Sequence, residues 1–427
     1  MIHNANHLRP NRDGLKVGGH QASCVSAVTL LTVLYFYVLR PRDHIAVKPH
    51  AAPVLHAVQY LLGRQSRAAL ENFRALGGAQ SYPSRTKDTA PVDFSTGSVG
   101  LGVGMTLFAA LTQDYVRLHG LVADSRPPGR MVAVVGDAEL DEGNVFEALL
   151  EGWKHDVRNL WWVIDYNRQS LDGVVNDHLF QKIQQFFATV GWKVVTLKYG
   201  KRLEAAFNRP DGSALRRWID ECPNDLYSAL TFQGGAAWRV RLAADLGNKP
   251  GIATLLATYD DDALHDLMTN LAGHDVAALI DAFDAAVNDE MPCCFVAYTV
   301  KGWNLPFAGH KDNHAGLMNP RQMEALRAAH AIPPGAEWDP YIGLDVPAEV
   351  LRNFLATISI GELDAIEHQP ALPMPAIGLR VAETTSTQEG FGRIMTELGR
   401  EGGEFARRVV TSSPDVTVST NLGGWVN

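Results

Sequence analysis

The chain has 427 residues, of which 46% are hydrophobic, and a formal net charge of −9. This length is sufficient for one large α/β domain and the start of another, and the mild acidity argues against a nucleic-acid-binding face. The four cysteines show no metal-ligand spacing; the adjacent Cys293 and Cys294 precede a predicted strand and are expected to be buried thiols in a reducing, cytoplasmic setting.

The first predicted element is an apolar helix over residues 25–39. This run is shorter than the ~18 apolar residues of a membrane span and has no small-residue cleavage site, so it predicts a buried helix rather than a membrane or signal segment. The motif GGHQAS at residues 18–23 stands directly before it, and its two glycines permit close backbone approach. Taken alone, His20 is more typical of a capping or packed residue than of a catalytic one.

Two further segments in the first quarter of the chain contain polar residues or glycines that could contact a ligand. Residues 43–53 read as a strand that ends in a turn containing Lys48 and His50. Lys48 could contact a phosphate as a point charge, or it could be a solvated turn lysine. The glycine-rich residues 94–104 open a predicted helix, whose first N–H groups would face an anion. A dinucleotide-binding loop is the rival interpretation, and it is disfavoured because that fingerprint follows a clear strand.

The chain is organised around residues 131–175, which read as strand, acidic turn, helix, strand and polar loop. Both strands are short apolar runs typical of a buried parallel sheet. Asp137 follows the first strand, and Asn167 and Gln169 follow the second. Ligands bind outside the carboxyl ends of such strands, so these residues are aimed at one crevice. A carboxylate, an amide oxygen and the backbone carbonyl of Gln169 suit Mg²⁺, although an acidic helix-capping turn is the simpler interpretation of Gly136-Asp137 alone.

These two motifs, GDAELDEGN at 136–144 and DYNRQSLDG at 165–173, resemble the transketolase superfamily of thiamine-diphosphate proteins. Within it they are most similar to the homodimeric-type pyruvate dehydrogenase, the decarboxylating first component of its complex. The resemblance implies an α/β fold, a parallel sheet with helices on both faces, plus the start of a second α/β domain. It also implies that Asp137, Asn167 and the backbone oxygen of Gln169 bind Mg²⁺. The motif residues implied to contact thiamine diphosphate are Gly136, Ala138, Glu139 and Leu171.

Two residues depart from the family motif. Ala138 stands where a third glycine is usual and adds one methyl group near the diphosphate. Asp165 stands where the first asparagine is usual and adds negative charge, which would disfavour a diphosphate unless the metal or a lysine offsets it.

The resemblance assigns roles around the reacting end of the cofactor. In the family, the GGH-x-AS motif places a histidine over that end, so His20 is implied to be catalytic and Ser23 to support it. His50 matches a histidine near the substrate and diphosphate, although the family usually has Gln-Gly where this chain has Lys48 and Pro49. Lys48 is kept as a cofactor-binding candidate.

Three more positions follow from the same resemblance. Tyr82, in a Ser-Tyr-Pro loop, and Gly100, in a Gly-Leu-Gly segment, are implied to line the cofactor, and the second segment also the dimer interface. A predicted strand over residues 295–300 delivers Lys301, and a histidine-rich loop follows. This arrangement suits an anionic substrate or a phosphate. The resemblance implies that Lys301 binds the cofactor and that His314 is catalytic.

The sequence predicts three parts. Residues 1–360 form the diphosphate- and Mg²⁺-binding domain, and the proline-containing residues 361–382 form a linker. Residues 383–427 would be the truncated start of a pyrimidine-binding domain, with a helix from residue 384 and one or two strands within 408–420. No residue in the sequence can be assigned the role of that domain's activating glutamate.

The resemblance implies oxidative decarboxylation of a 2-oxo acid, with pyruvate as the first candidate and acyl transfer to a lipoyl carrier. The implied partners are the 2-oxo acid, a second copy or a chain carrying the missing domain, and a lipoyl-bearing acyltransferase, with no nucleic acid and no membrane. Transketolase-type two-carbon transfer is one alternative. The other is a catalytically incomplete fragment or subunit that binds only the diphosphate and Mg²⁺, or a partner chain.

Overall fold

The computed structural model describes residues 1–11, 13–122, 128–170, 173–175, 179–358, 360, 371–378, 384–413 and 415–426. The chain divides into two compact units. Unit 1 comprises Met1–Tyr115 and Ser125–Glu362, and unit 2 comprises Val116–Asp124 and Leu363–Asn427. All predicted site residues belong to unit 1.

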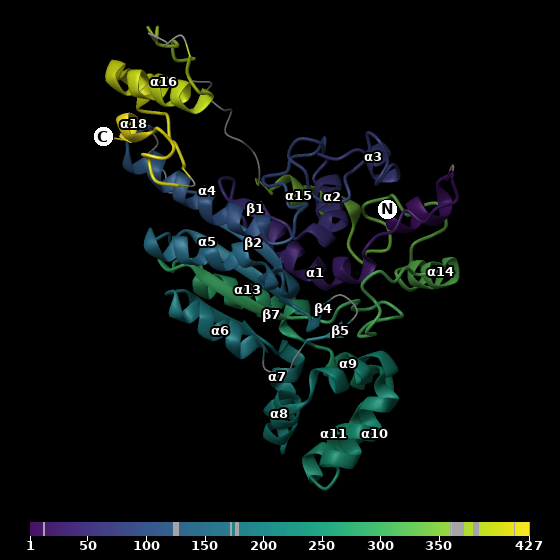
Figure 1. Ribbon diagram of the computed structural model, residues 1–427. Coiled ribbons are helices and arrows are strands. Elements are labelled where there is room, and N and C mark those ends of the chain that lie inside the picture. Colours follow the sequence, from purple (N-terminus) through teal and green to yellow (C-terminus); the bar gives the residue numbers. More distant parts are fainter. Residues whose placement is uncertain are drawn as a thin grey trace. The chain divides into compact units, whose positions relative to one another are not determined.

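Unit 1 is built on one five-stranded sheet (Figure 1). Its strands, in the order in which they pair, are β1 (His44–Ala46), β2 (Met131–Gly136), β3 (Leu160–Tyr166), β7 (Cys293–Tyr298) and β6 (Lys193–Leu197). Every neighbouring pair is parallel. Gly136 pairs with Asp165, and Asp165 pairs with Ala297, so the carboxyl ends of β2, β3 and β7 are level. Residues that follow these three strands therefore meet at one edge.

The helices of unit 1 connect and cover these strands. They are α1 (Gln21–Val33), α2 (Ala52–Leu61), α3 (Arg67–Glu71), α4 (Leu101–Leu118), α5 (Gly143–Lys154), α6 (Leu179–Thr189), α7 (Lys201–Phe207), α8 (Gly212–Glu221), α9 (Asn224–Gln233), α10 (Gly235–Leu246), α11 (Pro250–Thr258), α12 (Asp261–Met268), α13 (Val276–Ala286), α14 (Pro320–Ala329) and α15 (Ala348–Ala356). A two-stranded antiparallel ladder, β4 (Gln169–Ser170) with β5 (Gly173–Val174), follows β3.

The core has two layers because successive residues of a strand point to opposite faces of the sheet. Trp162 and Ile164 of β3 pack with α4, α5 and α6 on one face. Trp161 and Val163 pack with α1, α2 and α13 on the other. The parallel sheet with helices on both faces, as the sequence predicts, is confirmed.

The apolar helix near the start of the chain belongs to this core. α1 continues into a π-helical segment, Leu34–Val38. By length and composition Gln21–Val38 could cross a membrane, but 67% of it is buried within the protein. Leu30, Leu31 and Leu34 are fully buried among residues of β1, β2 and α13. The prediction of a buried helix is confirmed.

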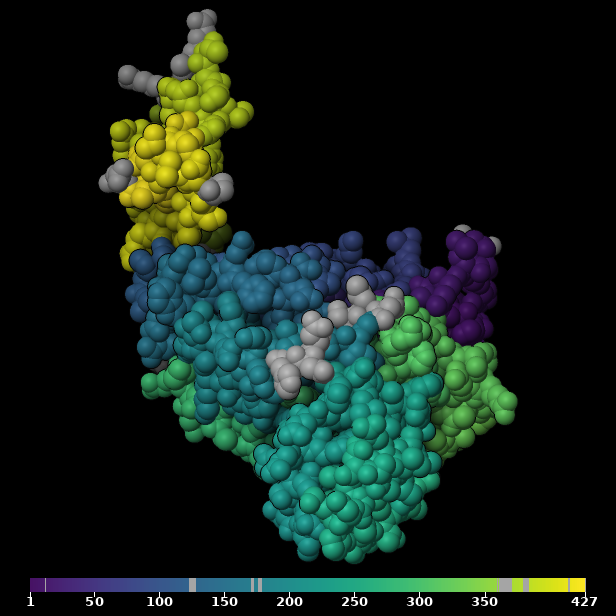
Figure 2. Space-filling model, turned by 60° about the horizontal axis from the view of Figure 1, so that its bottom comes forward, coloured from purple at the N-terminus to yellow at the C-terminus, as the bar shows by residue number. Residues whose placement is uncertain are grey.

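The segment between β6 and β7 is helical. Helices α7 to α12 gather at one end of unit 1, drawn in teal in Figures 1 and 2. After them, the turn at residues 273–275 caps α13, because the Asp275 carboxylate accepts the Ala278 N–H at 3.0 Å. The chain then returns as β7 to the position between β3 and β6.

Unit 2 contains α16 (Thr387–Glu401), α17 (Gly403–Ala406) and α18 (Gly423–Val426). The predicted helix is present as α16, but the strands predicted within residues 408–420 are wrong. In the described part of that segment the chain forms turns, and Leu422 N donates to Thr417 O at 2.9 Å. Val416 and Val418 are exposed, and the described residues of unit 2 contain no strand for them to pair with, whereas β-branched residues favour strands only with such a partner.

Candidate active site

The three predicted metal ligands lie together at the carboxyl edge of the sheet. Asp137, which follows β2, is buried, and its Oδ2 accepts the N–H of Arg168 at 2.9 Å. Asn167, which follows β3, accepts the N–H of Gln169 through Oδ1 at 3.1 Å. The loop over residues 167–169 is therefore held against the Asp137 carboxylate, as the spacing along the chain predicts.

These donors fit Mg²⁺ by their chemistry. A carboxylate, a side-chain amide oxygen and a backbone carbonyl are the hard oxygen ligands that this ion prefers. Burial, followed by the negative charge of Asp165, raises the pKa of Asp137 to about 7. A divalent cation beside this carboxylate would favour its ionised form.

Glu139 joins the turn after β2 to the glycine-rich start of α4. Its Oε1 accepts the N–H of Gly136 at 3.0 Å, and its Oε2 accepts the N–H of Gly100 at 2.9 Å. Gly100 has a φ of +77°, and a Cβ there would lie 2.8 Å from Cβ of Glu142. Glu139 thus holds together two other predicted cofactor-binding residues, Gly136 and Gly100.

Other residues predicted to bind the cofactor make fewer contacts with the rest of the site. Ala138 donates its N–H to Asp137 Oδ1 at 3.0 Å. Ser23 is buried in α1, and the Tyr82 ring lies 5.9 Å from the His50 ring. Leu171 lies outside the described residues.

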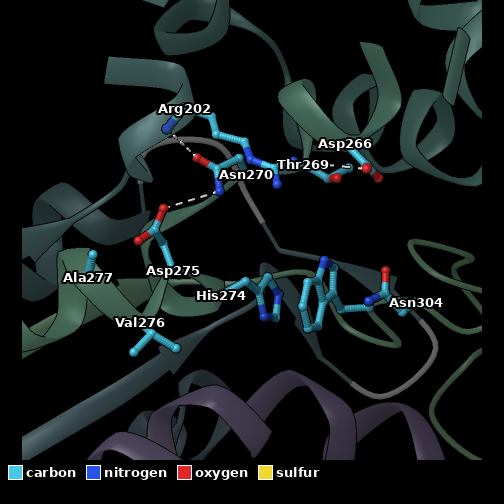
Figure 3. Close-up of a pocket in the computed structure, with 10 residues that line it drawn as sticks. Arg202, Asp266, Thr269, Asn270, His274, Asp275, Val276, Ala277 and Asn304 are labelled. Atoms are coloured by element: carbon cyan, nitrogen blue, oxygen red, sulfur yellow. Dashed lines mark hydrogen bonds and ion pairs between the residues drawn. The ribbon is translucent and has the colours of Figure 1, made fainter. Parts of the chain in front are cut away.

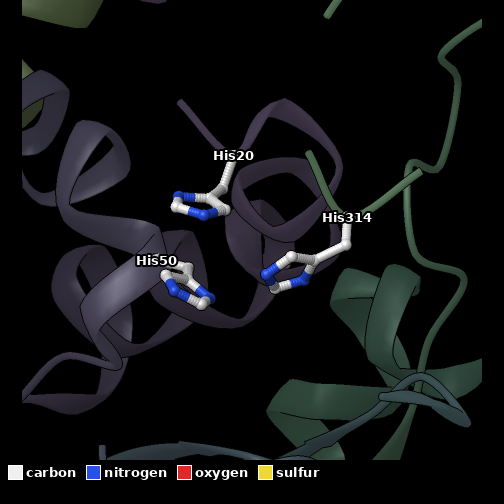
Figure 4. A group of neighbouring side chains, drawn as sticks. All are labelled: His20, His50 and His314. Carbon is white, nitrogen blue, oxygen red and sulfur yellow. The ribbon is translucent and has the colours of Figure 1, made fainter. Parts of the chain in front are cut away.

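The three predicted catalytic histidines form a cluster (Figure 4). The rings of His20 and His50 stack with centroids 3.9 Å apart, and the His314 ring lies 5.0 Å from His20 and 5.1 Å from His50. The three residues come from the start of α1, the short turn Pro49–Ala51 and the loop after β7. The fold therefore assembles this cluster from the two ends of unit 1's sequence.

His20 and His50 are neutral, and the cluster lies among cations. Burial lowers the pKa of His20 to about 4 and that of His50 to about 3, and the neighbouring imidazoles and lysines add to both shifts. Lys301 Nζ lies 3.2 Å from Nδ1 of His314. One ring nitrogen of each histidine lies within 4.8 Å of the others, as in a metal site. The adjacent ammonium groups instead favour an anionic ligand.

The two unusual residues Lys48 and Asp165 form a buried ion pair. Asp165 is fully buried, and its Oδ2 accepts hydrogen bonds from the Lys48 ammonium and, at 2.7 Å, from Ser26 Oγ. The hydroxyl of Thr299 donates to Oδ1. Burial raises the pKa of Asp165, but Lys48 and the hydroxyl donors outweigh this and hold it below its usual value. Lys48 therefore offsets the charge of Asp165, and its ammonium is directed at this carboxylate.

Asn313 is a site residue that the sequence does not single out. It is buried, and its Nδ2 donates to Gln169 Oε1 and to Lys301 O, both at 3.1 Å. Gln169 also donates through Nε2 to Gly309 O at 3.0 Å. These bonds join the predicted metal loop to the loop that carries His314. An asparagine among several histidines and lysines gives no signal of such a role.

A separate cavity of about 410 Å³ lies beside the turn that caps α13 (Figure 3). His274 stacks on Trp303 there, with ring centroids 4.4 Å apart and planes within 9°. Its Nε2 accepts the N–H of Val300 at 2.8 Å. Arg202 and Asn270 also line the cavity, which contains none of the predicted site residues.

A comparison with protein families matches one part of this chain. Residues 31–208, which include the predicted metal ligands, match the family described as transketolase, thiamine diphosphate binding domain. The resemblance to the transketolase superfamily is thus confirmed, and this segment is identified as a domain of that family.

The individual proteins that are similar to this chain have more specific names than the family. The pyruvate dehydrogenase E1 component of Cupriavidus necator is 30% identical over 98% of this chain and 49% of that protein. The E1 component of Corynebacterium glutamicum is 26% identical over 100% of this chain and 48% of that protein. The chain therefore spans about half the length of these curated relatives. Among solved structures, the transketolase of Campylobacter jejuni matches with a TM-score of 0.57 and 16% identity, over 90% of this chain and 56% of that one, which supports the fold.

Proposed function

We propose that this chain is the diphosphate- and Mg²⁺-binding part of a thiamine-diphosphate enzyme that oxidatively decarboxylates a 2-oxo acid. The observation that supports the proposal is the contact of the Asp137 carboxylate with the loop over residues 167–169, from which Asn167 and the Gln169 carbonyl would complete the set of oxygen ligands. The pyruvate dehydrogenase relatives favour pyruvate as the substrate.

In this proposal each group of residues has a distinct task. Asp137, Asn167 and the carbonyl of Gln169 would hold Mg²⁺ and, through it, the diphosphate. Bound thiamine diphosphate supplies the electron sink for loss of CO₂. His20, His50 and His314 would hydrogen-bond the carbonyl oxygen of the 2-oxo acid, since a neutral imidazole, as burial makes those of His20 and His50, still carries one N–H donor.

The site lies among positive groups, which supports an anionic substrate. Lys301 contacts His314, and its ammonium would attract the carboxylate of the 2-oxo acid toward the cluster. We further propose a cytoplasmic enzyme that works with a second copy or a chain carrying the second domain, and that passes its acyl group to a lipoyl-bearing acyltransferase.

The first test is ligand-linked stabilisation. Thiamine diphosphate and Mg²⁺ together should raise the melting temperature, because a ligand at 100 times its Kd adds about 2.7 kcal/mol of stability. Asp137→Ala should remove the shift, whereas Asp141→Ala should keep it, because Asp141 is an exposed carboxylate in the same turn. Thermal unfolding with and without the two ligands decides this. Equal shifts in both variants would place the ligand elsewhere.

The second test concerns the reaction. With the second domain supplied as a separate chain, the mixture should decarboxylate pyruvate in the presence of an artificial electron acceptor. Consumption of pyruvate and reduction of the acceptor are measured together. Turnover of a ketose phosphate instead, with no pyruvate consumed, would identify a transketolase.

A further inference from the structure

We propose that Asp165 is a positioning residue for the histidine cluster. Its carboxylate binds one side chain from each of the three chain segments that carry His20, His50 and His314. The inference rests on the proposed function, because it concerns how the residues of that site are held.

The first segment is the start of α1. Ser26 is fully buried in this helix, and its hydroxyl donates to Asp165 Oδ2 at 2.7 Å. His20 directly precedes the first residue of α1. Because the helix is rigid over this distance, fixing Ser26 against the sheet also fixes the end that carries His20.

The second segment is the turn Pro49–Ala51, which contains His50. Lys48 directly precedes this turn, and its side chain is only 5% exposed. Its ammonium pairs with Asp165 and also donates to Ser26 Oγ at 3.3 Å. The ion pair therefore ties the backbone beside His50 to β3 and to α1.

The third segment follows β7. The hydroxyl of Thr299, also fully buried, donates to Asp165 Oδ1. Lys301 comes two residues later, and its Nζ contacts Nδ1 of His314 at 3.2 Å. Asp165 acts on His314 through this short chain of contacts.

The three donors explain why a carboxylate is required here. An ammonium and two hydroxyls converge on Asp165, and an ionised carboxylate offers only acceptors. An asparagine would turn its NH₂ group toward a donor, and Lys48 would lose its counter-charge. With a neutral residue at position 48 no ammonium would need a counter-charge, so Lys48 and Asp165, which both differ from the usual family residues, depend on each other.

Nuclear magnetic resonance of the chain, labelled at its histidines, tests the proposal without cofactor. The ring signals of the cluster are assigned with His20→Gln, His50→Gln and His314→Gln. Asp165→Asn should shift all three sets of signals, because all three segments lose their common anchor. Two single-contact variants give a more selective result: Ser26→Ala should shift mainly the His20 signals, and Thr299→Val mainly those of His314.

Two further variants separate positioning from loss of stability. Thr106→Val removes another fully buried hydroxyl, which accepts the Trp162 Nε1–H at 3.1 Å. This hydroxyl makes no contact with Asp165 or with the three histidines. The substitution should lower the melting temperature and leave the histidine signals in place. The double variant Lys48→Gln with Asp165→Asn removes both charges and should return the signals toward their wild-type positions.

The outcomes are decisive either way. If Asp165→Asn lowers the melting temperature but leaves the three sets of signals unchanged, Asp165 is merely structural and the inference is overturned. If that variant does not fold, unchanged signals in both Ser26→Ala and Thr299→Val overturn it equally. A wild-type chain that fails to bind thiamine diphosphate would contradict the proposed function alone, because none of these measurements uses the cofactor.

Discussion

Buried polar side chains at the ends of β1, β2 and β3 decide the character of this site. Asp137, Asp165 and Lys48 are each less than 6% exposed, and each has a partner across the sheet edge. The position of Asp137 opposite Asn167 could be predicted, because neighbouring parallel strands in one βαβ unit bring their ends together. The pairing of Lys48 with Asp165 could not be predicted, because nothing local in sequence joins two residues so far apart in the chain.

Outside this site, the buried residue His274 should make the stability of the folded chain depend on pH. Burial lowers its pKa to about 3, against the weaker opposing charge of Asp165, and the Val300 N–H that Nε2 accepts also favours the neutral ring. Below pH 6.5 the unfolded chain binds a proton that the folded chain does not, so the free energy of unfolding falls as the pH falls toward the folded pKa. At pH 5 this single group should cost about 2 kcal/mol relative to pH 7.

The variant His274→Gln tests this effect, because its amide oxygen can still accept the Val300 N–H. Urea unfolding at pH 7 and pH 5 should show a smaller loss of stability for the variant than for the wild type. His20 and His50 contribute in the same direction and remain in both chains. An unchanged loss would mean that His274 takes up its proton in the folded state.

At the scale of elements, the joint between β2 and α4 depends on a single glycine. Gly100→Ala should destabilise the protein, because the left-handed conformation costs a residue with a side chain about 1–2 kcal/mol and the new Cβ would meet Glu142. Gly143→Ala is the matched control, since a Cβ at the start of α5 meets no atom within 4 Å. Thermal unfolding of the two variants should differ clearly, and equal melting temperatures would show that the loop relaxes freely.

The elements themselves were predictable to different degrees. Long apolar runs predict α1 and β3, and both elements form where the sequence predicts them. The strands predicted within residues 408–420 fail because strand propensity at Val416 and Val418 is only realised beside another strand. The π-helical end of α1 has no sequence signal that periodicity could detect.

At the scale of the whole molecule, the two units have unequal cores. Unit 2 packs around only three buried side chains among its described residues, Met395, Leu398 and Leu422. Small cores give marginal stability, so unit 2 should unfold at lower denaturant than unit 1. Leu398→Ala should remove about 2–5 kcal/mol from unit 2.

Trp425 packs against this small core and reports on it. Its fluorescence, isolated as the difference between the wild type and Trp425→Phe, should change before the far-ultraviolet circular dichroism of the bulk of the chain. In Leu398→Ala that early change should be lost or move to still lower denaturant, while the main transition stays in place. A single coincident transition in both proteins would show that the two units unfold together.

The strand order has a consequence for how the chain is made. β3 is buried along its whole length, yet its partner β7 begins only at Cys293. At about 5–20 residues per second, a ribosome needs about 6–25 s to extend the chain from one strand to the other. Throughout that interval the apolar edge of β3 has no hydrogen-bonding neighbour, and an open edge of this kind invites pairing with other chains. The nascent protein should therefore aggregate most readily while the residues between β3 and β7 are being translated. A chaperone that shields β3 during that time would raise the yield of folded protein.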